Sequence, residues 1–214
     1  MSLAKVDSDN EPDLILNDRG TDKLFFMKGF GGGFFLPSTM VVDYKSTVWV
    51  LHDLRTIDLD SDGKIDVVMS THIGADVWLA KGNGDGTFQA PTLIVASGVS
   101  KCCNRDMGQM VIADVNGDGR LDIVVDGYVA LQQANHSFVI NEHIGYSETR
   151  MLTAINLNND GRADIITKGS VPFDTNIAIF KTIAGVATNA STTGSPQSTV
   201  FSTAFANPLT VTVK

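Results

Sequence analysis

Short runs of apolar residues recur along the chain, and clusters of Gly, Asp and Asn separate them. Three such runs lie at residues 14–16, 67–69 and 123–125. Runs this short, rich in Val, Ile and Leu and bounded by turn-forming residues, are typical of β-strands. The heptad spacing of amphipathic helices is absent from the sequence. The pattern therefore predicts an all-β protein with many short strands.

An acidic segment of nine residues directly precedes each of these runs, and the segment is repeated. The third residues of successive copies are 53, 56 and 42 residues apart. These spacings suit a unit of about four short strands, as in a propeller blade. The four copies are KVDSDNEPD at residues 5–13, DLDSDGKID at 58–66, DVNGDGRLD at 114–122 and NLNNDGRAD at 156–164.

The rest of the unit is repeated as well. In the first two copies a Gly-rich turn occupies residues 28–34 and 81–88, and the Asn-Gly and Asp-Gly pairs of the second turn favour a tight hairpin. A last strand is predicted after the turn, for example at residues 92–96. One unit therefore contains four strands, an acidic loop and a hairpin. A second apolar run follows each acidic segment, at residues 24–27, 77–80, 129–131 and 177–180.

Some copies depart from this unit. The first copy begins inside its acidic loop at Lys5, so we expect it to lack the strand before the loop. In the third and fourth copies residues 132–138 and 181–187 replace the Gly-rich turn. The outer strands of these two copies are therefore less clearly marked in the sequence.

The composition excludes several classes of protein. The 214 residues carry 24 acidic and 16 basic side chains, which gives a formal net charge of −8, and no Lys/Arg cluster suits a phosphate backbone. Hydrophobic residues make up 43% of the chain and charged residues 19%, as in folded globular proteins. No apolar stretch is as long as a membrane span, which needs about 18 residues. We expect no nucleic-acid partner, no membrane insertion, and any export signal to lie outside this chain.

The acidic segment at residues 58–66 predicts a cation site. Asp58, Asp60, Asp62 and Asp66 stand at its positions 1, 3, 5 and 9. Four carboxylates this close repel one another unless a cation lies among them. Calcium takes about six to eight oxygen ligands, which side chains of a tight loop and one backbone carbonyl supply. The segment is shorter than an EF-hand loop and lacks its terminal Glu, so an EF-hand is not expected.

The other copies are ranked by the carboxylates that they offer. The copy at 114–122 offers three and the copy at 156–164 offers two, so calcium affinity is expected to fall in that order. The copy at 5–13 has Lys5 at its first position and Pro12 near its end, and it predicts a weak or empty fourth site. Solvated Asx turns without metal are the alternative. The candidate ligands, with the carbonyl of position 7 included, are Asp58, Asp60, Asp62, Lys64 and Asp66; Asp114, Asn116, Asp118, Arg120 and Asp122; Asn156, Asn158, Asp160, Arg162 and Asp164; and Asp7, Asp9 and Asp13.

These segments resemble the FG-GAP/VCBS repeat, the calcium-loop blade of integrin α-subunit propellers and of many secreted bacterial proteins. The resemblance covers about residues 4–183 and rests on DLDSDGKIDVVMS with the later GNGDGTF, on DVNGDGRLDIVV and on NLNNDGRADIIT. It implies β-propeller blades of four antiparallel strands, with the acidic residues above as calcium ligands. About four blades fit, fewer than the seven common in the family. Either further blades lie upstream of Met1, which makes this a partial propeller and is favoured, or four units form an open arc or small ring.

The C-terminal part differs in composition. Residues 182–213 carry no charge, and Ser, Thr, Ala and Gly dominate up to Pro196. We therefore predict blades over residues 1–183, a linker over 184–198, and the first strands of another domain over 199–214. This last segment resembles the start of a bacterial immunoglobulin-like repeat of the invasin/intimin type. Both resemblances imply a piece of a secreted or cell-surface bacterial protein.

Three functional classes remain open. The favoured one is a calcium-stabilised, non-catalytic recognition or adhesion module that binds a glycan or an extracellular protein through loops such as residues 71–76 and 97–108. The alternatives are a structural spacer and an accessory propeller of a polysaccharide-degrading enzyme. The chain is not expected to be an enzyme itself, because no serine elbow, zinc motif or phosphate loop occurs in it.

A few other residues have ordinary interpretations. Cys102 and Cys103 are adjacent, and two free thiols are favoured over a strained vicinal disulfide. Trp78 and Tyr128 could line a sugar-binding groove, but the apolar neighbours of Trp78 favour a place in the core. Trp49 is not assigned to either role.

Overall fold

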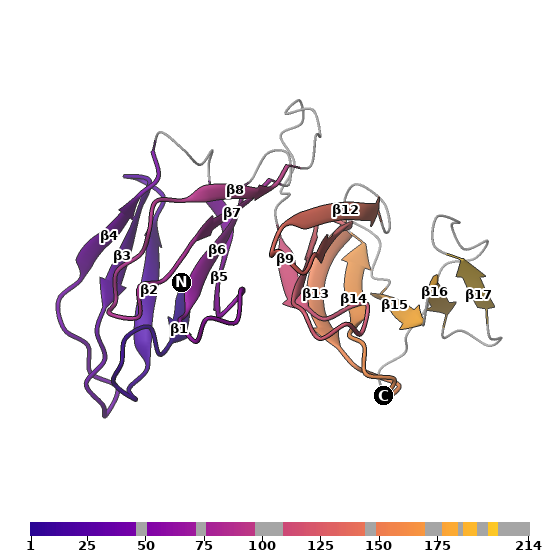
Figure 1. Cartoon of the computed structure of the whole chain (residues 1–214), viewed down its shortest axis with the longest axis horizontal. Helices are drawn as coiled ribbons and strands as arrows, with labels where there is room; N and C mark the ends of the chain where they lie inside the picture. Colours follow the sequence, from indigo (N-terminus) through magenta and orange to yellow (C-terminus); the bar gives the residue numbers. More distant parts are fainter. Residues whose placement is uncertain are drawn as a thin grey trace. The chain divides into compact units, whose positions relative to one another are not determined.

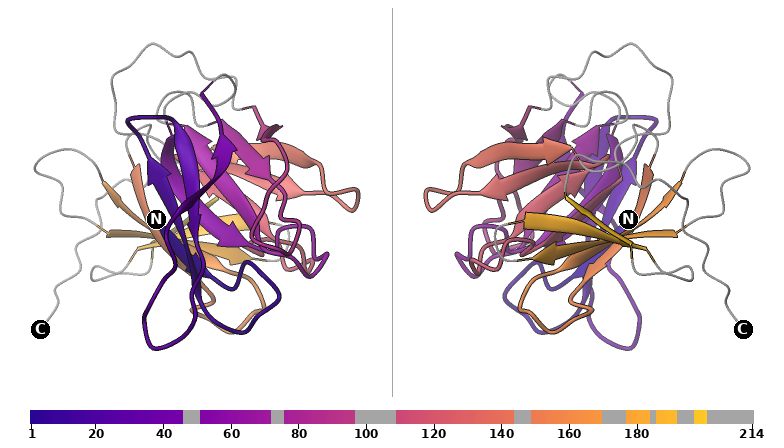
Figure 2. Two further views of the ribbon diagram at one scale, coloured as in Figure 1. Left: turned by 90° about the vertical axis from the view of Figure 1, so that its left-hand side faces the viewer. Right: turned by 90° about the vertical axis from the view of Figure 1, so that its right-hand side faces the viewer.

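The structure is a computed structural model, and it describes residues 1–45, 51–71, 76–96, 109–143, 149–169, 177–183, 186–191 and 197–200. Within these residues the regular secondary structure consists of seventeen strands in four antiparallel sheets. Figure 1 and Figure 2 show the strands as arrows. No helix among the described residues is long and apolar enough to cross a membrane. The all-β class predicted from the sequence is confirmed.

Two sheets lie in the first of two compact units, Met1–Gly108. In both sheets the strands follow the order of the chain, so each strand pairs with the next. We name the sheets blade 1 and blade 2. Blade 1 consists of β1 (Ser2–Ala4), β2 (Asp13–Asp18), β3 (Lys23–Met27) and β4 (Thr39–Asp43). Blade 2 consists of β5 (Leu51–Ile57), β6 (Asp66–Thr71), β7 (Val77–Ala80) and β8 (Thr92–Val95).

The second unit, Gln109–Lys214, holds blades 3 and 4. Their strands also follow the chain order, and blade 4 has a fifth strand. Blade 3 consists of β9 (Met110–Ala113), β10 (Asp122–Val125), β11 (Tyr128–Gln132) and β12 (Phe138–His143). Blade 4 consists of β13 (Thr149–Ile155), β14 (Asp164–Gly169), β15 (Ile177–Ile183), β16 (Val186–Ser191) and β17 (Gln197–Val200). The predicted four-stranded unit is therefore present in each of the four copies.

Blade 1 has the strand that the sequence analysis expected it to lack. β1 pairs with β2 in an antiparallel register in which Ser2 faces Ile15 and Ala4 faces Asp13. Ala4 also packs against the core of the first unit. The prediction was wrong because a strand of three residues, with one apolar side chain between two small residues, shows no periodicity in the sequence.

The hairpin of blade 3 forms without the glycines of blades 1 and 2. The Gln133 N–H donates to the Ser137 carbonyl at 2.8 Å, and the side chain of Asn135 accepts from the Ser137 N–H at 3.1 Å. Blade 2 makes the equivalent side-chain bond between the Thr87 N–H and Asp85 at 2.9 Å. An Asx residue two positions before a hydroxyl residue thus closes both turns, and β12 follows as a full outer strand.

Strands β16 and β17 lie partly within the segment predicted as a linker. β16 pairs with β15 and β17 pairs with β16, so these strands extend the sheet of blade 4. The division of the chain at residues 184–198 stays a prediction. Residues 201–214, the rest of the segment predicted to be immunoglobulin-like, lie outside the described residues.

The second strand of each blade carries much of the core. All six residues of β6 are buried, whereas three of the four residues of the outer strand β8 are exposed or half-buried. Val67 and Met69 of β6 belong to a core shared by blades 1 and 2, and the half-buried Trp78 packs against this core. In the second unit a smaller core contains Val111, Val115, Val124, Val129 and Ile165.

Two glycines allow the end of the third strand to approach the acidic loop. An ideal Cβ on Gly82 would lie 2.1 Å from the carbonyl oxygen of Ile65, and one on Gly29 would lie 2.0 Å from that of Pro12. Both obstacles are backbone atoms, which a side-chain rotation cannot move aside. Glycine is therefore required at these positions for the approach.

Replacing Gly82 should destabilise the protein for this reason. We expect Gly82→Ala to lower the free energy of unfolding by about 1–3 kcal/mol, because the added methyl group forces a backbone shift. Gly20→Ala is the control, since its Cβ would meet only the flexible side chain of Asp18, at 3.3 Å. Urea unfolding measures both variants, and equal stabilities would contradict the assignment.

Candidate functional site: four acidic loops

Each acidic loop joins the first strand of its blade to the second. The last residue of each loop is the first residue of the second strand, as in Asp66 at the start of β6. The repeat seen in the sequence is thus a repeat of position in the fold. We number the loops after their blades: loop 1 is residues 5–13, loop 2 is 58–66, loop 3 is 114–122 and loop 4 is 156–164.

The carboxylate at position 9 is buried and bonded to the backbone. Asp66 is 1% exposed, its Oδ2 accepts the N–H of Leu59 at 3.1 Å, and its Oδ1 accepts the N–H of Gly82 at 2.9 Å. The side chain at position 9, the first residue of the second strand, therefore bonds to the backbone at the start of its loop. In blades 1 to 3 it also bonds to the backbone at the end of the third strand. The equivalent donors are Val6 and Gly29 for Asp13, Val115 and Gln132 for Asp122, and Leu157 for Asp164.

Burial changes the acidity of these groups. Desolvation raises the pKa of Asp66 above its usual value and raises the pKa of Asp122 to about 6. The backbone N–H donors oppose this rise in both cases, whereas the neighbouring loop carboxylates add to it. The other carboxylates of each of these two loops thus repel the buried carboxylate at position 9.

Positions 1, 3 and 5 form the outer part of loop 2. One carboxylate oxygen from each of Asp58, Asp60 and Asp62 lies within 4.8 Å of the others. Asp58 accepts the N–H groups of Asp62 at 3.1 Å and Gly63 at 2.9 Å, so the backbone holds it in place. The Asx turns considered as the alternative to a metal site therefore form, and they also bring the carboxylates together.

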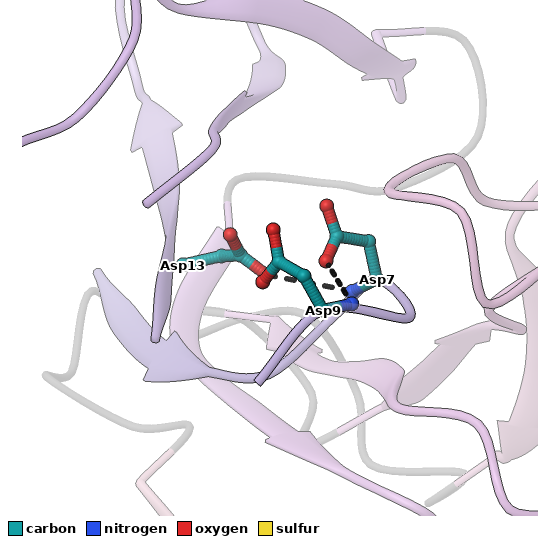
Figure 3. Close-up of side chains that lie close together, drawn as sticks. All are labelled: Asp7, Asp9 and Asp13. Atoms are coloured by element: carbon teal, nitrogen blue, oxygen red, sulfur yellow. Dashed lines mark hydrogen bonds between the residues drawn. The ribbon is translucent and has the colours of Figure 1, made fainter. Parts of the chain in front are cut away.

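Loop 1 shows the same convergence with different residues. Figure 3 shows Asp7, Asp9 and Asp13 close together, with one oxygen of each within 4.8 Å of the others. The Asp9 N–H donates to Asp7 Oδ1 at 3.0 Å. Loop 1 lacks an acidic residue at position 1, where Lys5 donates to the side chain of Asn10 at 3.3 Å.

Two lysines that the sequence analysis missed reach into loops 1 and 2. Lys28 Nζ donates to Asp7 and lies 2.5 Å from Asp9 Oδ2, and Lys81 Nζ donates to Asp60 at 2.5 Å. These bonds raise the pKa of each lysine and lower that of Asp9. Their equivalent positions in the sequence could have indicated this role, because each lysine directly precedes the first glycine of a Gly-rich turn.

Loop 3 is held by its first residue. Asp114 accepts the N–H groups of Gly117 at 2.6 Å and Gly119 at 2.8 Å. The Asn116 amide donates to Asp118 Oδ2 at 2.8 Å, and the Arg120 guanidinium donates to the same carboxylate. The side chain of Arg120 thus takes part in the loop, whereas the sequence analysis assigned only its carbonyl.

Loop 4 is joined to loop 3. Arg162 Nε donates to the Asn116 carbonyl and the Ala163 N–H donates to the Asp114 carbonyl, both at 2.8 Å. The guanidinium group of Arg162 therefore bonds to loop 3. Asn156 Oδ1, at position 1, is buried and has no hydrogen-bond partner among the described residues.

The geometry of loop 2, and one oxygen of loop 4, suit a hard divalent cation. Calcium prefers oxygen ligands, and loop 2 brings three carboxylates together while loop 4 leaves a buried oxygen without a donor. The position 9 carboxylates are already bonded to backbone N–H groups, but each oxygen keeps a second lone pair. The assignment of individual ligands stays a prediction.

Other predicted features lie outside the described residues. These are Cys102, Cys103 and Trp49, the whole of the loop at 97–108, and the loop at 71–76 except its two end residues. The Thr71 N–H donates to the Asp76 carbonyl at 3.0 Å, so the ends of that second loop are close together.

Comparison with known proteins supports a propeller-like fold. Residues 58–125 match the model of the FG-GAP-like repeat. A lectin of Agrocybe aegerita, described as specific for non-reducing terminal N-acetylglucosamine, superposes with a TM-score of 0.61 at 21% identity. The match covers 85% of this chain and 48% of the lectin, so the chain spans about half of that protein's length. The Tc holotoxin pore of Photorhabdus luminescens gives a TM-score of 0.47 at 14% identity, over 84% of this chain and 9% of that one. No curated protein matches the sequence.

The two parts of loop 2 should respond differently to mutation. Asp66→Ala leaves the buried N–H groups of Leu59 and Gly82 without their acceptor, so we expect a loss of about 2–4 kcal/mol in the free energy of unfolding, even in a chelator. Asp62→Ala should cost less than about 1 kcal/mol in a chelator, because Asp62 is exposed. Urea unfolding with EDTA tests this, and equal losses would contradict the distinction.

Proposed function

We propose that the chain is a calcium-stabilised, non-catalytic recognition module that binds a glycan through the loops of its blades. The observation that carries this proposal is the convergence of carboxylate oxygens in loop 2, inside the segment that matches the FG-GAP-like repeat. The likeness in fold to a lectin supports the glycan as ligand. A secreted or cell-surface bacterial protein is the setting we propose for it.

Calcium would act on the blades through the acidic loops. Within loop 2, Asp58, Asp60 and Asp62 would hold the ion, and Asp66 would connect it to β6 and to the end of β7. A bound ion would relieve the repulsion among the carboxylates and fix the start of the second strand. We propose about three such ions, in loops 2, 3 and 4.

Calcium should therefore raise the thermal stability of the chain. A ligand that binds only the folded state adds about 2.7 kcal/mol per site at a free concentration one hundred times its Kd. We expect the melting temperature to rise by several degrees with calcium and to fall again with EDTA, whereas magnesium should act more weakly because these loops are irregular oxygen sites. A melting temperature that ignores EDTA would contradict the metal sites.

Glycan binding should depend on the metal. We expect the chain to bind immobilised glycans that end in N-acetylglucosamine when calcium is present, and to bind them at least tenfold more weakly after EDTA treatment or with Asp62→Ala. Surface plasmon resonance measures both effects. Asp85→Ala is the control, since Asp85 caps the exposed hairpin of blade 2 outside the acidic loop.

The outcome separates the functional classes. A chain that responds to calcium but binds no glycan on an array would favour a structural spacer. Release of reducing sugar from a polysaccharide by the isolated chain would overturn the non-catalytic assignment.

A further inference from the structure

Lys28 and Lys81 occupy the same place in blades 1 and 2. Each directly follows the third strand of its blade. The residues before them, Met27 and Ala80, pair with the second residue of β2 and of β6, so the backbone positions are equivalent. In blade 3 this place is taken by Leu131. The chain therefore contains the position with and without an ammonium group.

The Lys28 ammonium group lies where a cation is needed in loop 1. Its Nζ donates to Asp7 Oδ2 and lies 2.5 Å from Asp9 Oδ2. These are two of the three carboxylates that converge within 4.8 Å, the third being Asp13. Asp13 accepts two backbone N–H groups. The other two carboxylates, Asp7 and Asp9, are bridged by the one ammonium group of Lys28.

The arrangement of the charged groups differs between loops 1 and 2. Loop 1 has Lys5 at position 1, where loop 2 has Asp58. Loop 2 brings three carboxylates together, and each of its two ammonium groups contacts only one of them. Lys81 bonds to Asp60 and Lys64 Nζ lies 3.8 Å from Asp62 Oδ2, so neither bridges the cluster and a divalent ion can still bind among the three carboxylates. In loop 1 a divalent ion would have to displace Lys28 from both carboxylates and would find no carboxylate at position 1.

We propose that Lys28 is the permanent counter-ion of loop 1 and takes the place that calcium takes in loops 2 to 4. Blade 1 is then independent of calcium, and its loop stays closed when the metal is removed. The inference rests on the proposed function only for the calcium ions in the other loops.

The test is the number of calcium ions bound by the full chain, measured by equilibrium dialysis and elemental analysis. Lys28→Met keeps the length of the side chain and removes its charge, which frees Asp7 and Asp9 beside Asp13. We expect this variant to bind one calcium ion more than the wild type. Lys28→Arg keeps the charge and should bind the same number of ions as the wild type.

Two further variants locate the additional ion. Asp9→Asn in the Lys28→Met background should abolish it, because one of the converging carboxylates is lost. Lys23→Met is the matched control, because Lys23 lies outside the loop and its Nζ is 4.0 Å from Asp43 Oδ2. This variant should bind the same number of ions as the wild type. Circular dichroism in EDTA confirms that each variant is folded.

The outcomes distinguish this inference from the proposed function. An unchanged ion count in folded Lys28→Met would overturn the inference, and so would a wild-type chain in which loop 1 already holds calcium. A wild-type chain without any calcium would refute the proposed metal sites. The gain of one ion in Lys28→Met would then still support the role of Lys28.

Discussion

The buried carboxylate at position 9 is the interaction on which each blade depends. It accepts a backbone N–H from the start of its own loop and, in blades 1 to 3, another from the end of the third strand. Three segments distant in sequence are thereby joined at one side chain. In blades 1 and 2 the approach also requires a glycine, because Gly29 and Gly82 lie against backbone carbonyls.

This cross-link creates the need for a cation. In loops 2 and 3 the neighbouring carboxylates add to the rise in the pKa of the buried one, which burial itself causes in the main. The basic side chains near the loops are placed differently. Lys28 bridges two carboxylates of loop 1, Arg120 pairs with Asp118 in loop 3, and Arg162 leaves loop 4 for the backbone of loop 3.

The sequence predicted the blades because their signals are local. The acidic loops and the apolar runs after them are contiguous, so β2, β6 and β10 could be placed within a few residues. The roles of Lys28 and Lys81 could not be predicted, since they depend on the register between the second and third strands. The short β1 was missed, and the outer strand after the hairpin at Gln133 was less clearly marked, for another reason: backbone pairing forms them without an apolar run or glycines.

We propose that the acidic loops are cation sites of two kinds, which share the buried carboxylate at position 9. The decisive experiment is a crystal structure of the chain grown in calcium, with an anomalous difference map. We expect one calcium peak in each of loops 2, 3 and 4, with the Lys28 ammonium group between Asp7 and Asp9 in loop 1. A map without a peak in any of the four loops at saturating calcium would show that the loops are not calcium sites.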